Sequence, residues 1–198
     1  MSKRSQKKAE NRSRLIRSAA VSFAAQGLKG ANINHISLEA GLGKGTVYNY
    51  FASKEELFEA VLTLAGRELG RRLDEIETTT GPAAKRLKAL ASGLLAFYGE
   101  QPDLAKMLIR QAAAHRQEHQ QALVSALEPF LTSTQEALSA GASRGEFRSD
   151  LDPFLSAVAL WGMVNHQAAF HWLVSNRPLD PKGAAELVMT YFLDGVKG

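Results

Sequence analysis

Asn32–Phe58, NINHISLEAGLGKGTVYNYFASKEELF, is the stretch that decides the fold of this chain of 198 residues. Asn32 is a residue type that caps helix N-termini, because its side-chain oxygen accepts a hydrogen bond from a free backbone N–H of the first turn. Apolar residues then recur at helical spacing. Gly41 stands where a helix can end in the left-handed conformation that glycine adopts easily. These signals predict a short helix over residues 33–40 that packs by one edge.

A glycine-rich turn separates this helix from a second one. Gly43 and Gly45 deliver the chain into a second short helix, predicted over residues 44–51. Val47 and Phe51 are four residues apart, so both can face the core of the protein. The opposite face is then polar, basic and partly without side-chain bulk. The major groove of DNA requires such a slim helix end, with donors for base edges and anchors for phosphates.

The start of a third, longer helix is marked by Ser53 and Glu56. These residues form the S-x-x-E pattern of a capping box, in which each side chain satisfies a free backbone N–H of the first turn. Two short helices around a glycine turn, followed by a third helix, indicate a helix-turn-helix. An ordinary surface turn between three helices would explain each residue singly, but it does not explain the joint pattern.

The segment also carries a series of residues at fixed spacing: Ile36…Ala40-Gly41-Leu42…Gly45-Thr46-Val47-Tyr48-Asn49-Tyr50-Phe51…Ser53-Lys54-Glu55-Glu56-Leu57. The series resembles the DNA-binding signature of the TetR family of transcriptional regulators, I-A-x-x-A-G-V-S-x-G-T-[LIV]-Y-x-[HY]-F-x-[ST]-K-x-x-L, and the resemblance covers residues 10–60. There are two departures from the signature. Ser37 replaces the usual alanine, and Gly43, a weaker helix cap, stands where a capping Ser or Thr is common.

The polar face of the 44–51 segment supplies the candidate DNA-contacting residues. We expect the following residues to face base edges: Asn34, Lys44, Gly45, Tyr48 and Asn49. We expect the following residues to hold phosphate oxygens: Asn32, Thr46, Tyr50 and Lys54.

Charge is distributed unevenly along the chain. Residues 1–50 contain nine Lys or Arg against Glu10 and Glu39, a net charge of +7. The whole chain carries +4, so the remainder carries −3. A basic first quarter on an acidic remainder is typical of a polyanion-binding head on a globular body. Residues 1–9 are expected to be disordered in the free protein, and either a groove-binding arm or a plain solubilising tail would fit them.

The rest of the chain has a helical pattern throughout, and no alternating run is long enough for a strand. The fold class is therefore predicted to be all-α, with about nine helices, a head over residues 1–53 and a body over residues 54–198. Besides the two short helices over residues 33–40 and 44–51, helices are predicted over residues 10–26, 54–77, 83–99, 103–115, 119–141, 153–174 and 181–196.

Composition excludes several other classes of function. The chain has no cysteine, which rules out disulfides, thiolate zinc sites and cysteine nucleophiles. No phosphate-binding loop, nucleophile elbow or H-E-x-x-H motif is present, so neither an enzyme nor a cofactor is expected. His115 and His119 are spaced to share a metal ion, but HRQEH has no evident third ligand and a solvated helix end explains it better. With no signal peptide and no apolar membrane span, the protein is expected in the cytoplasm.

The carboxy-terminal body suggests a dimer. The segment 153–174 is apolar nearly all round, so more than one face has to be covered. The resemblance implies that this helix and the last one pair with their copies in a homodimer, which would read two half-sites of a palindromic double-stranded operator. The residues expected at this interface are Leu155, Val158, Trp161, Trp172, Leu187, Tyr191 and Phe192.

The resemblance also implies an effector pocket in the body, and the effector itself remains unidentified. Polar groups within apolar helices, with aromatic residues nearby, are typical of small-molecule sites. The residues expected to line this pocket are Phe97, Met107, Arg110, Gln111, His115, Trp161, Asn165, His166 and Phe170.

Together these features predict a sequence-specific DNA-binding regulator, namely a homodimeric repressor released from its operator by a small molecule. Repression and activation are not distinguished by the sequence. The competing hypothesis is a sequence-neutral polyanion binder whose basic head acts by charge alone. The placement of Gly45 and Tyr48 on the exposed face of the 44–51 segment argues against this hypothesis, because binding by charge alone needs no slim helix end.

Overall fold

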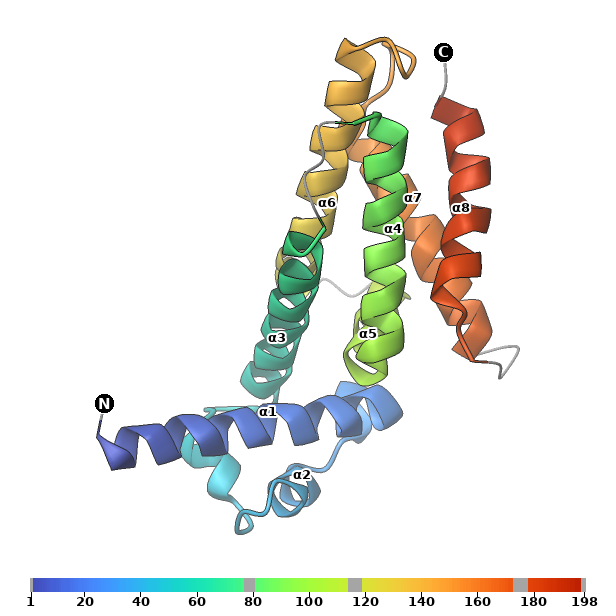
Figure 1. Cartoon of the computed structure of the whole chain (residues 1–198). Coiled ribbons are helices and arrows are strands. Elements are labelled where there is room, and N and C mark those ends of the chain that lie inside the picture. The colour runs from blue at the N-terminus through green and yellow to red at the C-terminus, as the bar shows by residue number, and fades with distance from the viewer. Residues whose placement is uncertain (1, 77–80, 114–118, 173–177, 197–198) are drawn as a thin grey trace. The chain divides into compact units, whose positions relative to one another are not determined.

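The computed structural model describes residues 2–76, 81–113, 119–172 and 178–196, and these residues form helices without strands (Figure 1). In chain order, the helices are α1 (Lys3–Gly30), α2 (Ile33–Glu39), the 3-10 helix η1 (Thr46–Asn49), α3 (Lys54–Asp74), α4 (Ala83–Glu100), α5 (Pro102–Ala113), α6 (Gln120–Ser143), α7 (Pro153–Phe170) and α8 (Pro181–Val196). The predicted all-α class is confirmed. None of the described helices is long and apolar enough to cross a membrane.

These helices divide into two compact units. Unit 1 contains residues 1–65 and 103–126, and unit 2 contains residues 66–102 and 127–198. The helices α3 and α6 each contribute one part to unit 1 and the other part to unit 2. This division describes which residues pack together, whereas the boundary predicted at residues 53/54 separates a DNA-binding head from an effector-binding and dimerisation body.

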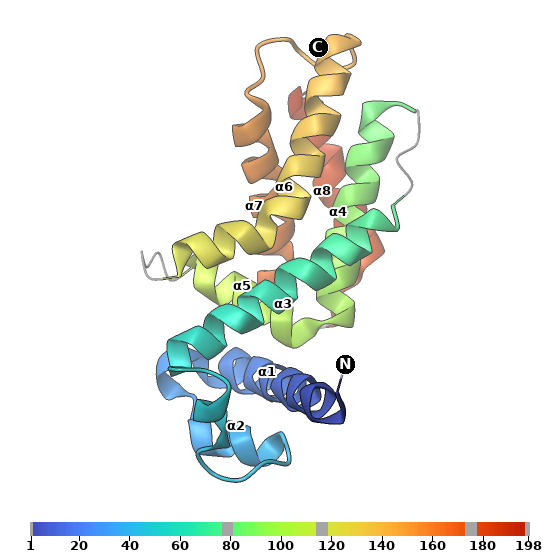
Figure 2. The same ribbon diagram turned by 90° about the vertical axis from the view of Figure 1, so that its left-hand side faces the viewer.

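Unit 1 is built on α1, against which α2 packs (Figures 1 and 2). The core of α1 is an apolar stripe that includes Leu15, Ala19 and Phe23, spaced four residues apart. The regular helix ends at Gly27, whose φ of 69° is not helical, and one further turn follows to Gly30. The N-terminal end departs from expectation: α1 begins at Lys3, so residues 3–9, expected to be disordered, are helical and exposed.

In unit 2, α4 packs against both α7 and α8 (Figures 1 and 2). Leu87, Leu94 and Tyr98 of α4 are among its fully buried side chains. Gly93 allows a close approach, since a Cβ built there would lie 2.6 Å from the Cδ1 of Ile76. Asp152 begins α7 by accepting a hydrogen bond from the Leu155 N–H at 2.9 Å, and Pro153 occupies the first turn, where its missing N–H has no cost.

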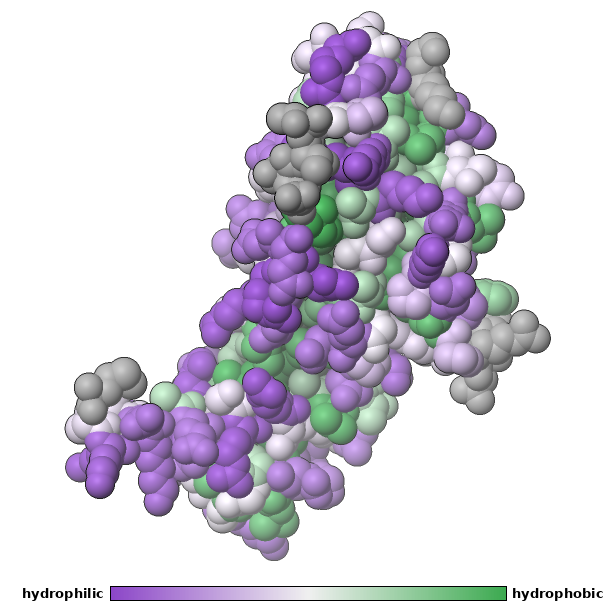
Figure 3. Space-filling model, viewed as in Figure 1, coloured by the Kyte–Doolittle hydropathy of each residue, from purple (hydrophilic) through white to green (hydrophobic). Residues whose placement is uncertain are grey.

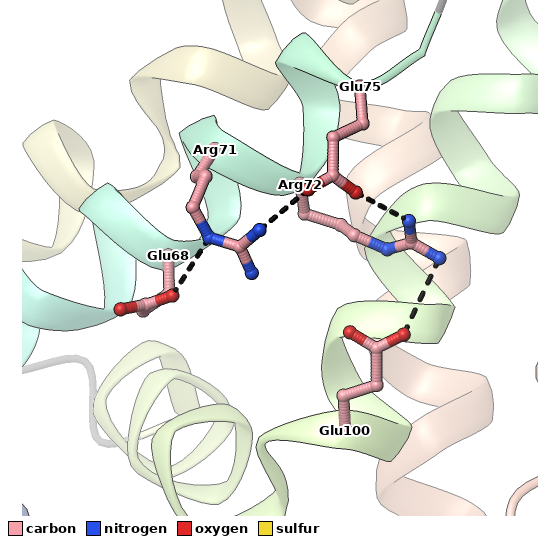
Figure 4. A network of polar contacts seen from close by, with 5 residues as sticks. All are labelled: Glu68, Arg71, Arg72, Glu75 and Glu100. Atoms are coloured by element: carbon pink, nitrogen blue, oxygen red, sulfur yellow. Dashed lines mark hydrogen bonds and ion pairs between the residues drawn. The ribbon is translucent and has the colours of Figure 1, made fainter.

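A charged network extends across unit 2 from α3 to α4 (Figure 4). Arg71 contacts Glu68 at 3.3 Å and Glu75 at 2.6 Å on its own helix. Arg72 contacts Glu75 at 3.0 Å and reaches Glu100 of α4 at 3.4 Å. Because these side chains are partly solvated, each pair contributes at most about 1 kcal/mol.

Candidate nucleic-acid interface

The helix α2 begins as the sequence predicts. The Oδ1 of Asn32 accepts from the backbone N–H groups of Asn34, at 2.9 Å, and His35, at 3.3 Å. Ile36 is fully buried, and the helix is followed by Gly41 at φ 67°. One side of α2 is therefore anchored in the core of unit 1, and the other side is free to face a ligand.

The turn after α2 is held by a contact between the two residues that depart from the family signature. The hydroxyl of Ser37 donates to the carbonyl oxygen of Gly43 at 2.6 Å, and Ser37 is fully buried. The same carbonyl accepts from the N–H of Thr46 at 3.1 Å. The Ser37 hydroxyl therefore fixes the turn that places the following segment.

The helix predicted over residues 44–51 is shorter and tighter than expected. Only Thr46–Asn49 is helical, as the 3-10 helix η1. Gly45 precedes it in the left-handed conformation, at φ 75°, and Tyr50 ends it at φ −122°. A segment confined to four residues by its two ends favours i→i+3 hydrogen bonds, such as Tyr48 N–H to Gly45 O at 3.2 Å.

The two faces of this segment separate as predicted. Val47 and Phe51 are buried in the core of unit 1. All five residues expected to face bases are exposed: Asn34, Lys44, Gly45, Tyr48 and Asn49. Tyr48 is 59% exposed, so its ring is available for contact.

The residues expected to contact phosphate are engaged within the protein, Thr46 excepted. The Oδ1 of Asn32 caps α2, which leaves its amide nitrogen free to donate. The hydroxyl of Tyr50 accepts from the Nδ2 of Asn11 at 3.0 Å and keeps its own hydrogen for a further acceptor. The Nζ of Lys54 donates to the carbonyl oxygens of Lys29 and Ala31, each at 3.1 Å, so its charge also satisfies the end of α1.

Two residues of α1 support the segment and were not identified from the sequence. Asn11 holds Tyr50 by the hydrogen bond just described, and the guanidinium carbon of Arg12 lies 4.9 Å from the centroid of the Phe51 ring. A cation over an aromatic face is attractive by about 0.5–1 kcal/mol at an exposed site. Both contacts join positions 39 residues apart, and no local pattern in the sequence signals them.

The third helix begins with the predicted capping box, in a modified form. The Ser53 hydroxyl accepts from the Glu56 N–H at 3.1 Å. The Glu56 carboxylate accepts from the N–H of Ala52, one residue before the cap. These two hydrogen bonds hold residues 52–56, which connect η1 to α3, and thereby fix the position of Lys54.

The first half of α1 adds a basic, solvated surface to unit 1. Lys3, Arg4, Lys7, Lys8 and Arg14 are exposed, and hydrophilic side chains cover the visible face of this segment (Figure 3). The positive charge of the first 50 residues is therefore largely accessible to a polyanion.

The residues predicted to line an effector pocket lie in different parts of the chain. Met107, Arg110 and Gln111 line a cavity in unit 1, together with residues of α1 and α3. Phe97, Trp161 and Asn165 belong to unit 2, while His166 and Phe170 are exposed there. His115 lies outside the described residues.

A buried polar cluster surrounds Tyr98 in unit 2. The Tyr98 hydroxyl donates to the Oδ1 of Asn165 at 3.1 Å, and its ring centroid lies 6.1 Å from that of Trp172. Burial raises the pKa of Tyr98 far above its usual value. The phenol is therefore neutral and acts as a hydrogen-bonding group within apolar surroundings.

His119 contacts groups of its own unit. Its Nδ1 lies 2.9 Å from the Oε1 of Glu59, and its ring centroid lies 5.2 Å from that of Phe58. Among the described residues, no three His, Asp or Glu side chains gather closely enough to hold a metal ion.

The predicted dimer residues differ in exposure. Leu155 and Tyr191 are 61% and 67% exposed, and Leu187 is also exposed. The side chains of Val158, Trp161 and Trp172 are half-buried. Phe192 is only 6% exposed, because it packs into the core of unit 2 with the inner face of α8, and so it offers little surface to a second chain.

Two family descriptions match the sequence. Residues 15–61 match "Bacterial regulatory proteins, tetR family". Residues 80–196 match "Tetracyclin repressor-like, C-terminal domain".

Individual relatives agree with these matches. The HTH-type transcriptional repressor KstR2 of Mycobacterium tuberculosis is 30% identical over 145 residues, which cover 71% of each chain. The HTH-type transcriptional regulator YhgD of Bacillus subtilis is 25% identical over 94% of this chain and 97% of its own length. The crystal structure of the regulator FadR from Bacillus subtilis, in complex with stearoyl-CoA, has the same fold, with a TM-score of 0.81 at 20% identity over 92% of this chain and 97% of FadR.

Proposed function

The chain belongs to the TetR family of bacterial regulatory proteins, and from this premise we propose that it is a homodimeric repressor that a small molecule releases from a palindromic operator. Membership makes it a DNA-binding transcription regulator and not an enzyme. Repression, dimerisation, effector control and a cytoplasmic location are the proposed parts.

The observation that carries the DNA-binding assignment is the division of the η1 segment into a buried side and an exposed side. Val47 and Phe51 fix the segment, so the exposed residues have a defined position before DNA arrives. The Asn49 amide can pair with adenine N6 and N7, and the Lys44 ammonium can donate to guanine O6 and N7. Gly45 lets the backbone approach the bases, and the apolar edge of Tyr48 suits a thymine methyl group.

The phosphate contacts proposed for Asn32, Thr46, Tyr50 and Lys54 are compatible with their present partners. Tyr50 and Lys54 each retain one hydrogen to donate, and the partner of each is a group of α1. A phosphate bound by these two residues would therefore be linked to two parts of α1, through Tyr50 to Asn11 and through Lys54 to the last turn at Lys29. The basic residues of the first half of α1 would add sequence-independent attraction.

The proposed dimer uses the exposed apolar side chains of α7 and α8. Leu155, Leu187 and Tyr191 are the largest contributors among the predicted residues, with Val158, Trp161 and Trp172 at the margin. A two-fold arrangement would place two heads on half-sites about 34–36 Å apart, or a multiple of that distance. It would also cover apolar surface that is costly to leave in water.

The proposed effector site in the body centres on Phe97, Trp161 and Asn165, next to the buried Tyr98. A few hydrogen-bonding groups among aromatic side chains can orient a small molecule. Acyl-CoA thioesters are the first compounds to test, since FadR of Bacillus subtilis has been crystallised with stearoyl-CoA. An effector that binds better to a body conformation with mismatched heads would lower operator affinity by its differential binding free energy.

A selection of bound duplexes from a random pool, followed by titration, tests the DNA-binding proposal. The selected duplex and a scrambled duplex of the same composition are titrated at several salt concentrations. We expect tighter binding to the selected duplex by at least about a thousandfold at physiological salt. Equal affinity and an equal salt slope for both would support the sequence-neutral polyanion binder instead.

A pair of variants links this result to the η1 face. Tyr48→Ala removes an exposed side chain from the proposed groove face, and Val21→Ala removes one from the exposed side of α1. We expect only Tyr48→Ala to weaken binding to the selected duplex, with the circular dichroism of both variants unchanged.

A further inference from the structure

A cavity of about 340 Å3 lies within unit 1 and has no role in the proposed reading of DNA. One part of its wall is apolar: Phe23 and Leu28 come from α1, Phe58 from α3 and Met107 from α5. Its volume lies at the lower end of the range typical of small-molecule sites, about 300–1,000 Å3. This cavity is distinct from the cluster around Tyr98, whose residues all belong to unit 2.

The shape of the cavity is fixed by aromatic packing. The rings of Phe23 and Phe58 meet edge to face, with centroids 5.2 Å apart and planes at 74°. The His119 ring packs on the same Phe58 and is held by Glu59. Phe23, Phe58 and Met107 are held in place by the surrounding core, and their apolar surface at the cavity favours a flat, apolar group.

Two cations stand at the edge of this cavity. Lys29 and Arg110 both line it, and neither side chain forms an ion pair within the part of the chain that the structure describes. Three sources of negative potential oppose them: the carboxylate of Glu59 and the C-terminal ends of α1 and α5. Glu59 is already paired with His119, and the Lys54 ammonium satisfies the last carbonyls near the end of α1. The balance at the rim is therefore positive.

We propose that this cavity binds a small aromatic carboxylate, with the ring between the apolar walls and the carboxylate at Lys29 and Arg110. A guanidinium matches a carboxylate with two parallel hydrogen bonds, which gives the site direction as well as charge. Gln26, which also lines the cavity, can donate to a second oxygen. The site is additional to the effector site proposed in the body and does not depend on it.

Occupancy of this cavity would act directly on the DNA-binding head. Gly27, with its non-helical φ, allows the turn that follows it to change direction. This turn forms one wall of the cavity through Leu28 and Lys29, and its backbone holds Lys54. It leads within three residues to Asn32, the cap of α2. A bound carboxylate thus sets the position of the segment from which α2 starts.

Binding can be read at the methyl group of Met107, because this residue lines the cavity. Protein labelled with 13C at the methionine methyls is titrated with 3-phenylpropanoate, and the shifts of Met107, Met163 and Met189 are followed. We expect a saturable shift of the Met107 signal by the ring current of the ligand. Met163 and Met189 belong to unit 2, so they should not move and they report that the protein stays folded.

Ligand charge and protein charge are then varied separately. Phenylpropylamine and phenylpropanol have the same ring and chain length, and we expect both to bind at least about tenfold more weakly than the carboxylate. Arg110→Gln and Lys29→Gln should each weaken phenylpropanoate binding by about tenfold or more, as expected for the loss of one charged hydrogen-bond donor. Lys85→Gln, which removes an exposed cation of unit 2, should leave it unchanged.

Three results would overturn the proposal. The first is a Met107 signal that does not move at millimolar phenylpropanoate. The second is movement of the Met163 or Met189 signal in its place, which would put the ligand in unit 2. The third is equal binding of the carboxylate and the amine, since the rim charge would then have no effect.

Discussion

Gly45 gives the sharpest test of how the head meets DNA, because two separate reasons for a glycine can be distinguished there. Its φ of 75° is a conformation that other residues adopt at a cost, and a Cβ built on it meets no atom within 4 Å. Gly45→Ala therefore causes no clash and costs about 1–2 kcal/mol through the backbone alone. Urea denaturation should show a loss of this size in the free energy of unfolding.

The second reason for a glycine is close approach of the backbone to the bases. A methyl group at position 45 would stand on the exposed face, so we expect operator affinity to fall by about tenfold or more, equivalent to about 1.4 kcal/mol. Gly45→Asn separates the two effects, since asparagine tolerates the left-handed conformation better than alanine. Relative to Gly45→Ala, Gly45→Asn should recover part of the free energy of unfolding, as measured by urea denaturation. It should recover none of the operator affinity, as measured by fluorescence anisotropy with a labelled duplex.

Gly145 provides a matched control within the same chain. It has a φ of 70°, its Cβ would also meet nothing within 4 Å, and it lies in the turn between α6 and α7. Gly145→Ala should therefore lower stability as much as Gly45→Ala and leave operator affinity unchanged. Wild-type affinity in Gly45→Asn would refute the close-approach argument, and wild-type stability in Gly45→Ala would refute the argument from conformation.

Four further outcomes are expected. Ser37→Ala should lower the free energy of unfolding by about 1 kcal/mol in a urea titration, since the Gly43 carbonyl keeps its second hydrogen bond; no change would mean that the buried hydroxyl contributes nothing to the turn. Lys54→Met should weaken operator binding and reduce its salt slope by about one unit, and an unaltered slope would exclude a phosphate contact. Tyr191→Glu should give monomers in sedimentation at micromolar concentration, while Val124→Glu, at an exposed position of α6, should not; a dimer in both would place the interface elsewhere. The pKa of Glu146 is lowered in the folded protein, first by the hydrogen bond from Arg144, so its contribution to stability is present above its ordinary value of 4.5 and is lost as the pH falls through the folded value; Glu146→Gln should flatten the stability profile there, and an unchanged profile would contradict the assignment.

Local signals were sufficient to predict most of the helices. α2 was predicted from the Asn32 cap and Gly41, and the start of α3 from the Ser53 and Glu56 pair. The start of α8 was predicted correctly at Pro181, because proline is favoured in a first turn and disfavoured further on. In each case the residue that fixes the boundary acts on backbone groups within four positions of itself.

The contacts that the sequence did not predict join distant parts of the chain. The pairing of Asn11 with Tyr50 joins α1 to the DNA-binding segment across 39 residues. Met107 and Arg110 were predicted to line an effector pocket in the body, and they line the cavity of unit 1 together with Phe23 and Phe58. Which helices share a core is decided by packing, and a single sequence shows only that each helix has an apolar face.

The bond between Ser37 and Gly43 has a consequence for how this chain and its relatives can diverge. The family signature has alanine at the first position and a capping hydroxyl at the second, whereas this chain has the hydroxyl at the first position and glycine at the second. A single hydroxyl thus serves the turn from either side, and a sequence that lost both would hold it less firmly. The two positions should therefore change together over evolutionary time: relatives with glycine at the second position should be enriched in serine or threonine at the first, and ancestors that changed one position at a time should have passed through a serine at both.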